Sequence, residues 1–263
     1  MKLKHAPFGE TPKAWLYAPA SLREHQDVPI VVFLHGWYGC LQVLVEAEGA
    51  PCQPGGLTRS AMDLRAQFAA SGASALFVVP QLAFDKASSA PGGLAQRGLF
   101  KAMLDEIMAL PELRSALPDG AKRGHVVLIG HSGAYLPLGR ALGVGGVDVH
   151  EVWLLDALYL DVPEIGPWFR AHQADFWPAR RRRLAFVYTE GEKTGPRTLR
   201  QIDLLAAQLP AADRAAATWK GQAATAASDE DLSHPLVAQL TDGRHSEIPR
   251  FALVPLLRTA TLR

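Results

Sequence analysis

The amino-acid sequence has little net charge and no long hydrophobic run. Its 27 lysine and arginine residues nearly balance 26 aspartate and glutamate residues, which leaves a formal net charge of +1 at pH 7. Nucleic acids and anionic membranes are bound by concentrated basic surfaces, so we expect neither as a partner. No stretch of roughly eighteen apolar residues is present, and residues 1–13 lack the apolar segment of a secretory signal. The sequence therefore predicts no membrane span and a cytoplasmic location, or secretion if a leader was removed.

Cysteine is scarce as well. The chain has two cysteines, Cys40 and Cys52, which fall in one expected loop. An oxidising compartment would permit a disulfide between them, whereas a reducing cytosol would keep both as thiols. No spacing of cysteine and histidine has the pattern of a zinc site, so we expect no metal and no other cofactor. The only basic run, at residues 180–183, precedes an apolar strand and is expected to be solvated.

Apolar segments of strand length alternate with segments of helical spacing. The expected strands lie at 13–17, 30–34, 74–79, 125–129, 149–155 and 184–188, with a short strand near 218–220 and an apolar run at 236–240. Helical spacing of apolar residues is found at 57–70 and 100–110. Strands that are apolar throughout are buried on both faces, which is typical of a parallel sheet. The sequence predicts an α/β fold with a mostly parallel central sheet flanked by helices, as one domain over residues 1–263.

The most informative motif is Gly130-His131-Ser132-Gly133-Ala134, which follows the apolar run 125–129. A strand that turns sharply into a helix raises the side chain at the apex above the sheet, and it needs small residues two positions to either side. Here Gly130 and Ala134 are those residues, and 134–142 follows as a helix. This pattern predicts a nucleophile elbow with Ser132 as the nucleophile; the alternative is a glycine-rich turn in an ordinary βα unit.

With a second motif, the elbow makes the chain resemble the α/β-hydrolase family of serine hydrolases, which includes esterases and lipases. The segment Phe33-Leu34-His35-Gly36-Trp37 is similar to the His-Gly turn that supplies half of that family's oxyanion hole. The resemblance extends from this turn to the helix after His245. It implies an α/β-hydrolase fold without a large cap domain, with the backbone N–H groups of Trp37 and Gly133 as the oxyanion hole.

The family order of nucleophile, acid and histidine guides the choice of base among nine histidines. His245 lies in a polar turn before a terminal helix that begins near Ile248, which is where the family keeps its base. Histidine suits this role because it exchanges a proton near neutral pH. His234 is the rival, but its link to Pro235 at the start of a strand would place it at the opposite end of the sheet.

Two positions are candidates for the acid that orients the histidine. Asp156 ends an apolar strand one strand after the elbow, and a carboxylate that follows large apolar residues must be satisfied nearby. Glu190 and Glu192 follow the next strand, which is the commoner family position, but they lie in a turn that looks solvated. We prefer Asp156 and keep the two glutamates as the alternative.

Aromatic residues near these motifs are candidates for a substrate pocket. Tyr38 follows the His-Gly turn, and Trp168 belongs to the aromatic segment 159–177, which would either cover the site as a small lid or pack as a core helix. The predicted function is that of a serine hydrolase that cleaves a small-molecule carboxylic ester, or less favourably an amide or thioester, through an acyl-enzyme on Ser132. The alternatives are an acyltransferase that uses the same acyl-enzyme and a hydrolase-like protein that binds a ligand or partner without turnover.

Overall fold

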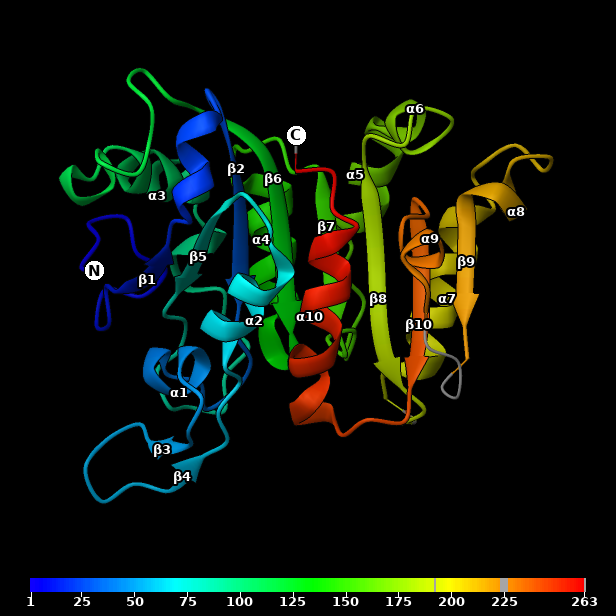
Figure 1. Ribbon diagram of the computed structural model, residues 1–263. Coiled ribbons are helices and arrows are strands. Elements are labelled where there is room, and N and C mark those ends of the chain that lie inside the picture. The colour runs from blue at the N-terminus through cyan, green and yellow to red at the C-terminus, as the bar shows by residue number, and fades with distance from the viewer. Residues whose placement is uncertain (192, 223–226, 263) are drawn as a thin grey trace.

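A central eight-stranded sheet organises the computed structural model, which describes residues 1–191, 193–222 and 227–262 (Figure 1). The strands are β1 (Ala14–Tyr17), β2 (Asp27–Leu34), β5 (Leu76–Pro80), β6 (Lys122–His131), β7 (Glu151–Leu155), β8 (Arg183–Thr189), β9 (Thr218–Gly221) and β10 (Leu236–Thr241). Their order is β1-β5-β2-β6-β7-β8-β10-β9. Strand β1 is antiparallel to β5, and the other neighbouring pairs are parallel. The predicted mostly parallel sheet is confirmed.

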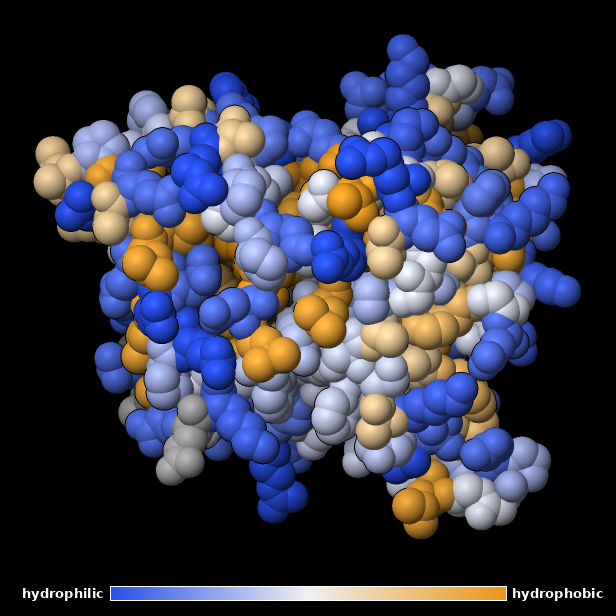
Figure 2. All heavy atoms as spheres, turned by 180° about the vertical axis from the view of Figure 1, so that it is seen from behind, coloured by the Kyte–Doolittle hydropathy of each residue, from blue (hydrophilic) through white to orange (hydrophobic). Residues whose placement is uncertain are grey.

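Helices cover both faces of the sheet, which explains why its strands are apolar throughout. In β2, Val31 and Phe33 pack into one layer of the core, while Val32 and Leu34 pack into the other. The first layer lies under α2 (Leu64–Ser71) and α10 (Ile248–Arg258), and the second under α3 (Leu99–Met108), α4 (Tyr135–Val144) and α7 (Gly195–Ala206) (Figure 1). Seen from the α3 and α4 side, the outer surface is largely hydrophilic with scattered apolar side chains (Figure 2). In the described ranges, no helix is long and apolar enough to cross a bilayer.

The remaining elements are short. They comprise α1 (Leu41–Val45), α5 (Ile165–Ala171), α6 (Gln173–Phe176), α8 (Arg214–Ala217), α9 (Asp229–Leu232), the strands β3 (Ala50–Pro51) and β4 (Thr58–Arg59), and 3-10 turns at Ala20–Glu24, Gly92–Ala95, Pro111–Leu113, Ser132–Ala134 and His245–Glu247. The helix predicted at 57–70 begins only at Leu64. Residues 58–59 instead pair with residues 50–51 as an antiparallel hairpin, which makes the start of the predicted helix extended.

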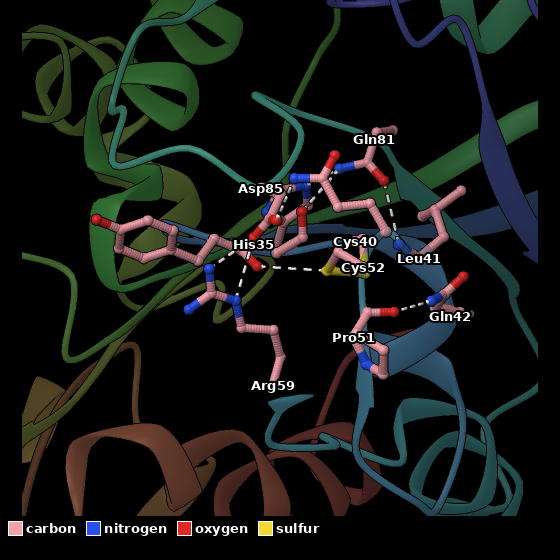
Figure 3. The surroundings of a disulfide bond; sticks show 12 residues. His35, Cys40, Leu41, Gln42, Pro51, Cys52, Arg59, Gln81 and Asp85 are labelled. Atoms are coloured by element: carbon pink, nitrogen blue, oxygen red, sulfur yellow. Dashed lines mark hydrogen bonds and ion pairs between the residues drawn. A yellow bond between two sulfur atoms is a disulfide. The ribbon is translucent and has the colours of Figure 1, made fainter. Parts of the chain in front are cut away.

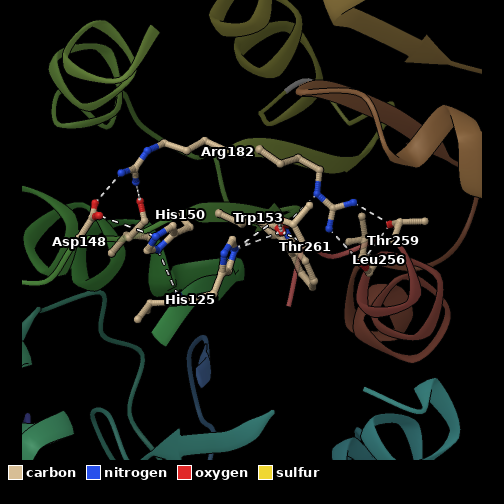
Figure 4. Close-up of polar contacts among 12 residues, drawn as sticks. His125, Asp148, His150, Trp153, Arg182, Leu256, Thr259 and Thr261 are labelled. Atoms are coloured by element: carbon tan, nitrogen blue, oxygen red, sulfur yellow. Dashed lines mark hydrogen bonds and ion pairs between the residues drawn. The ribbon is translucent and has the colours of Figure 1, made fainter. Parts of the chain in front are cut away.

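The basic run at 180–183 is not solvated throughout, contrary to the sequence-based expectation. Arg182, which Figure 4 shows beside Asp148, and its neighbour Arg183 are buried at the amino end of β8. Arg183 donates to Glu151 over 2.7 Å, and Arg182 donates to Asp148 over 2.7 Å. The parallel register of β7 and β8 places Glu151 directly beside Arg183. The two arginines therefore neutralise carboxylates at the end of the sheet opposite to the elbow.

Candidate active site

The elbow at Ser132 is formed by an abrupt change from strand to helix. Strand β6 ends at His131, and Ser132 has a φ of 54°, a left-handed conformation that is uncommon for residues other than glycine. A 3-10 turn then leads into α4. A Cβ on Gly130 would lie 2.9 Å from Cδ1 of Leu138, so a larger residue at this position would force the Leu138 side chain of α4 to shift. The local sequence thus raises the Ser132 side chain at the carboxyl edge of the sheet.

Three of the predicted residues form a hydrogen-bonded chain at this edge. Oγ of Ser132 lies 2.8 Å from Nε2 of His245, and Nδ1 of the same imidazole lies 2.6 Å from Oδ2 of Asp156. A carboxylate only accepts hydrogen bonds, so Nδ1 carries the proton and Nε2 is left to accept from the serine hydroxyl. The structure thus brings together residues from the ends of β6 and β7 and from the turn before α10.

The carboxylate of Asp156 is buried and surrounded by donors. Besides His245, it accepts hydrogen bonds from the N–H of Thr189 (3.3 Å), from the Thr189 hydroxyl (3.2 Å) and from the Thr194 hydroxyl. Burial acts to raise the pKa of Asp156, but these hydrogen bonds outweigh it and hold the pKa below its usual value. The ionised carboxylate is therefore the stable form beside the imidazole.

The end of β8 and the turn after it, which the sequence offered as the alternative source of the acid, contact Asp156 through other residues. They supply Thr189 and Thr194 as donors to Asp156, whereas Glu190 is exposed to solvent. Glu192 lies outside the described residues. Sequence reasoning missed the two threonines; Thr189 is the last residue of β8, the strand next to β7, and Thr194 directly precedes α7.

A second histidine packs against His245. The ring of His131 stacks on it at a centroid distance of 5.0 Å, and Nε2 of His131 donates to the backbone carbonyl of His245 over 3.1 Å. Burial, together with the neighbouring His245, lowers the pKa of His131 to about 3, so His131 stays neutral. The rival base His234 lies just before the amino end of β10, where its ring contacts the carbonyls of Glu230 and Asp231.

The His-Gly turn lies against the elbow. A Cβ on Gly36 would stand 3.1 Å from the amide nitrogen of Gly133, and the indole of Trp37 covers the space where a Gly133 side chain would be. The backbone N–H of Trp37 donates to no backbone carbonyl in the described part of the chain, while its indole N–H donates to Oγ of Ser89 over 2.8 Å. The two predicted donor residues, Trp37 and Gly133, are thus neighbours across the turn and the elbow, on the side of Ser132 that faces β2.

His35 fixes the shape of this turn. Its Nδ1 donates to the carbonyl of Gly36 over 2.8 Å, and its Nε2 accepts from the N–H of Leu82 over 2.8 Å. Burial lowers the pKa of His35 to about 4, although the bond to Gly36 acts in the opposite direction. His35 is therefore a neutral structural residue that ties the turn after β2 to the segment after β5.

A disulfide and an ion pair hold the segment that follows the turn. Cys40 and Cys52 are bonded, which answers the question that the sequence leaves open (Figure 3). Arg59 of the β3–β4 hairpin donates to Asp85 over 2.8 and 3.1 Å and lies over the ring of Tyr38 at 4.4 Å. These contacts fix the wall formed by α1 and the hairpin.

The serine lies in a cavity of about 720 Å³. Its wall is mainly apolar and aromatic and includes Trp37, Tyr38, Val43, Leu44, Met62, Tyr135, Tyr159 and Leu160. Tyr38 thus lines the cavity, as expected, but Trp168 does not. The Trp168 indole is buried and donates to the carbonyl of Val149, at the amino end of the sheet. Helices α5 and α6 pack into the core instead of forming a lid, since their aromatic residues pack on one another there.

Among the described residues, no group of three or more histidine, cysteine, aspartate or glutamate side chains is placed to hold a metal ion.

Comparison with known proteins gives structural but no sequence matches. No protein-family model matches the chain, and no curated protein matches it. The feruloyl esterase module from Clostridium thermocellum, solved as an S954A mutant with sinapinate, has 8% sequence identity and a TM-score of 0.58, over 95% of this chain and 83% of that chain. A structure named FAE gives 10% identity and a TM-score of 0.58 over the same shares. The chain therefore has the α/β-hydrolase fold.

Proposed function

We propose that this protein is a serine hydrolase that cleaves carboxylic esters through an acyl-enzyme on Ser132. The observation that carries the proposal is the pair of short contacts that link Ser132, His245 and Asp156. A serine hydroxyl is a weak nucleophile unless a base within hydrogen-bonding reach takes its proton. The 2.8 Å contact with Nε2 of His245 meets this requirement.

In the proposed reaction, Nε2 of His245 takes the Ser132 proton while Oγ attacks the ester carbonyl. The negative charge on the carbonyl oxygen is stabilised by the backbone N–H groups of Trp37 and Gly133. The imidazolium is stabilised by Asp156 and returns its proton to the departing alcohol. Water then repeats the sequence on the acyl-enzyme and releases the acid.

The cavity favours an acyl group with a flat apolar surface. Its aromatic wall, which includes Trp37, Tyr38, Tyr135 and Tyr159, offers ring faces and edges to such a group. The similar feruloyl esterase module was solved with sinapinate, which is an aromatic acid. We therefore propose esters of aromatic carboxylic acids as the first substrates to test.

The deciding experiment is labelling with a fluorophosphonate probe, followed by peptide mass spectrometry. The parent protein should carry the probe on Ser132 and hydrolyse 4-nitrophenyl esters. Ser132→Ala should fold normally but lose labelling and several orders of magnitude of turnover. Ser60→Ala, which changes another serine that lines the cavity, should behave like the parent. A folded parent that neither reacts with the probe nor hydrolyses esters would show a binding protein without turnover.

A further inference from the structure

Tyr159 contacts the reacting groups but has no part in the mechanism above. It lies shortly after Asp156, in the segment between β7 and α5, and it lines the cavity with Ser132. Its hydroxyl lies 3.4 Å from Nδ1 of His245, and its ring meets the imidazole edge-on at a centroid distance of 5.9 Å. The side chain of Ser132 is near enough to this hydroxyl to act on the pKa of Tyr159, in the lowering direction. Tyr159 is therefore within reach of the nucleophile and beside the base.

The order of the strands shows on which side of Ser132 this hydroxyl lies. Strand β6, which carries the elbow, has β2 on one side and β7 on the other. The turn with Trp37 follows β2, whereas Asp156 and Tyr159 follow β7. Tyr159 thus approaches the serine from the side of His245 and not from that of the predicted oxyanion hole.

The departing alcohol must occupy the same side. An ester's leaving oxygen receives its proton from Nε2 of His245, so it must lie within hydrogen-bonding distance of that nitrogen. A hydroxyl beside both the imidazole and Oγ of Ser132 is therefore close to the leaving oxygen. Burial and the nearby charge of Asp156 raise the pKa of Tyr159, which keeps the phenol protonated and able to donate.

We propose that Tyr159 is a further catalytic residue, whose hydroxyl donates a hydrogen bond to the leaving oxygen of the ester during acylation. This inference rests on the proposed function. As the bond between the carbonyl carbon and the leaving oxygen breaks, its electron pair stays on that oxygen. The proton on Nε2 of His245 is transferred to the oxygen, and the phenol keeps its own proton while its hydrogen bond stabilises the developing charge.

The test compares two esters of one aromatic acid, the ethyl ester and the 4-nitrophenyl ester, with Tyr159→Phe. Ethoxide is a poor leaving group that needs stabilisation, whereas 4-nitrophenolate leaves readily without it. We expect kcat/KM, which reports acylation, to fall roughly 10- to 100-fold for the ethyl ester and less than about 3-fold for the 4-nitrophenyl ester. The rate of fluorophosphonate labelling at Ser132 should stay at the parent value, because fluoride needs no such donor.

Tyr188→Phe is the control, since it removes the hydroxyl of a tyrosine on β8 that does not line the cavity. It should leave both esters at parent rates. An equal loss on the two esters, no loss on either, or the same selective loss in Tyr188→Phe would overturn the role of Tyr159. A parent protein that neither labels nor hydrolyses overturns the proposed function itself, so the two failures are distinguishable.

Discussion

Gly36 lies directly against Ser132, so closely that no other residue type fits between the His-Gly turn and the elbow. A Cβ on Gly36 would stand 2.6 Å from Cβ of Ser132 and 3.0 Å from its Oγ. Real side chains do not approach backbone-anchored atoms at such distances. The absence of a side chain at residue 36 therefore sets the separation between the nucleophile and the N–H group of Trp37.

Gly36→Ala should lower turnover by about 100-fold or more, because the added methyl group pushes the turn and its donor away from the site of the carbonyl oxygen. Steady-state hydrolysis of a 4-nitrophenyl ester measures the loss. Gly9→Ala is the control, since a Cβ on Gly9 has no neighbour within 4 Å. Parent-like turnover in a folded Gly36→Ala protein would mean that the turn has no part in catalysis.

Asp156→Asn should lower turnover by roughly 10⁴-fold while the shape of the site is kept, because an amide favours the wrong tautomer of His245. Glu190→Gln should change turnover by less than about 3-fold, since its exposed carboxylate is screened by solvent. Both rates are measured on the same ester. A large loss in Glu190→Gln beside a nearly normal Asp156→Asn enzyme would assign the acid to the turn after β8.

Features that depend only on residues adjacent in the chain were predictable from the sequence. The apolar strands and the Gly130 to Ala134 elbow are local patterns, and parallel strands bring their carboxyl ends to one edge. The preference for Asp156 rested on the cost of a buried carboxylate without partners, and the structure provides such partners.

Features that depend on the register of distant segments were not predictable. The donors Thr189 and Thr194 reach Asp156 only because β8 pairs with β7. The burial of Arg183 has the same origin, since its partner Glu151 is remote in sequence. Trp168 was a candidate for the pocket but packs at the opposite end of the sheet. The sequence of an aromatic segment does not show at which end of the sheet it packs.

The two buried histidines beside the site should make the protein less stable in mild acid. The pKa is 6.5 for an ordinary histidine but about 4 for His35 and about 3 for His131, both lowered by burial. Between pH 6.5 and 4.5, the unfolded chain therefore binds more protons than the folded protein, and the free energy of unfolding falls as the pH falls. The maximum slope is about 1.4 kcal/mol per pH unit for each histidine. The lowered carboxylate pKa values of Glu151 and Asp156 act mainly below this window.

Urea unfolding at several pH values checks this expectation. His131→Asn should have a shallower pH slope than the parent, while His25→Gln, at a partly exposed position, should keep the parent slope. An unchanged slope in His131→Asn would show that His131 does not contribute to acid sensitivity.

The ion pair at the opposite end of the sheet should matter for stability and not for catalysis. Glu151 and Arg183 are both buried, and Arg183 also donates to the carbonyls of Leu232 and Leu256. Arg183→Met leaves the Glu151 carboxylate without its cation, which should lower the free energy of unfolding by about 3–5 kcal/mol. Adding Glu151→Leu should recover part of that loss, because it removes the unpaired charge. Urea unfolding measures the free energy of unfolding of each variant. Turnover, measured where each variant is folded, should stay near the parent value, because the pair lies at the amino ends of β7 and β8. Equal losses of stability in the single and double variants would show that the carboxylate is satisfied without the arginine.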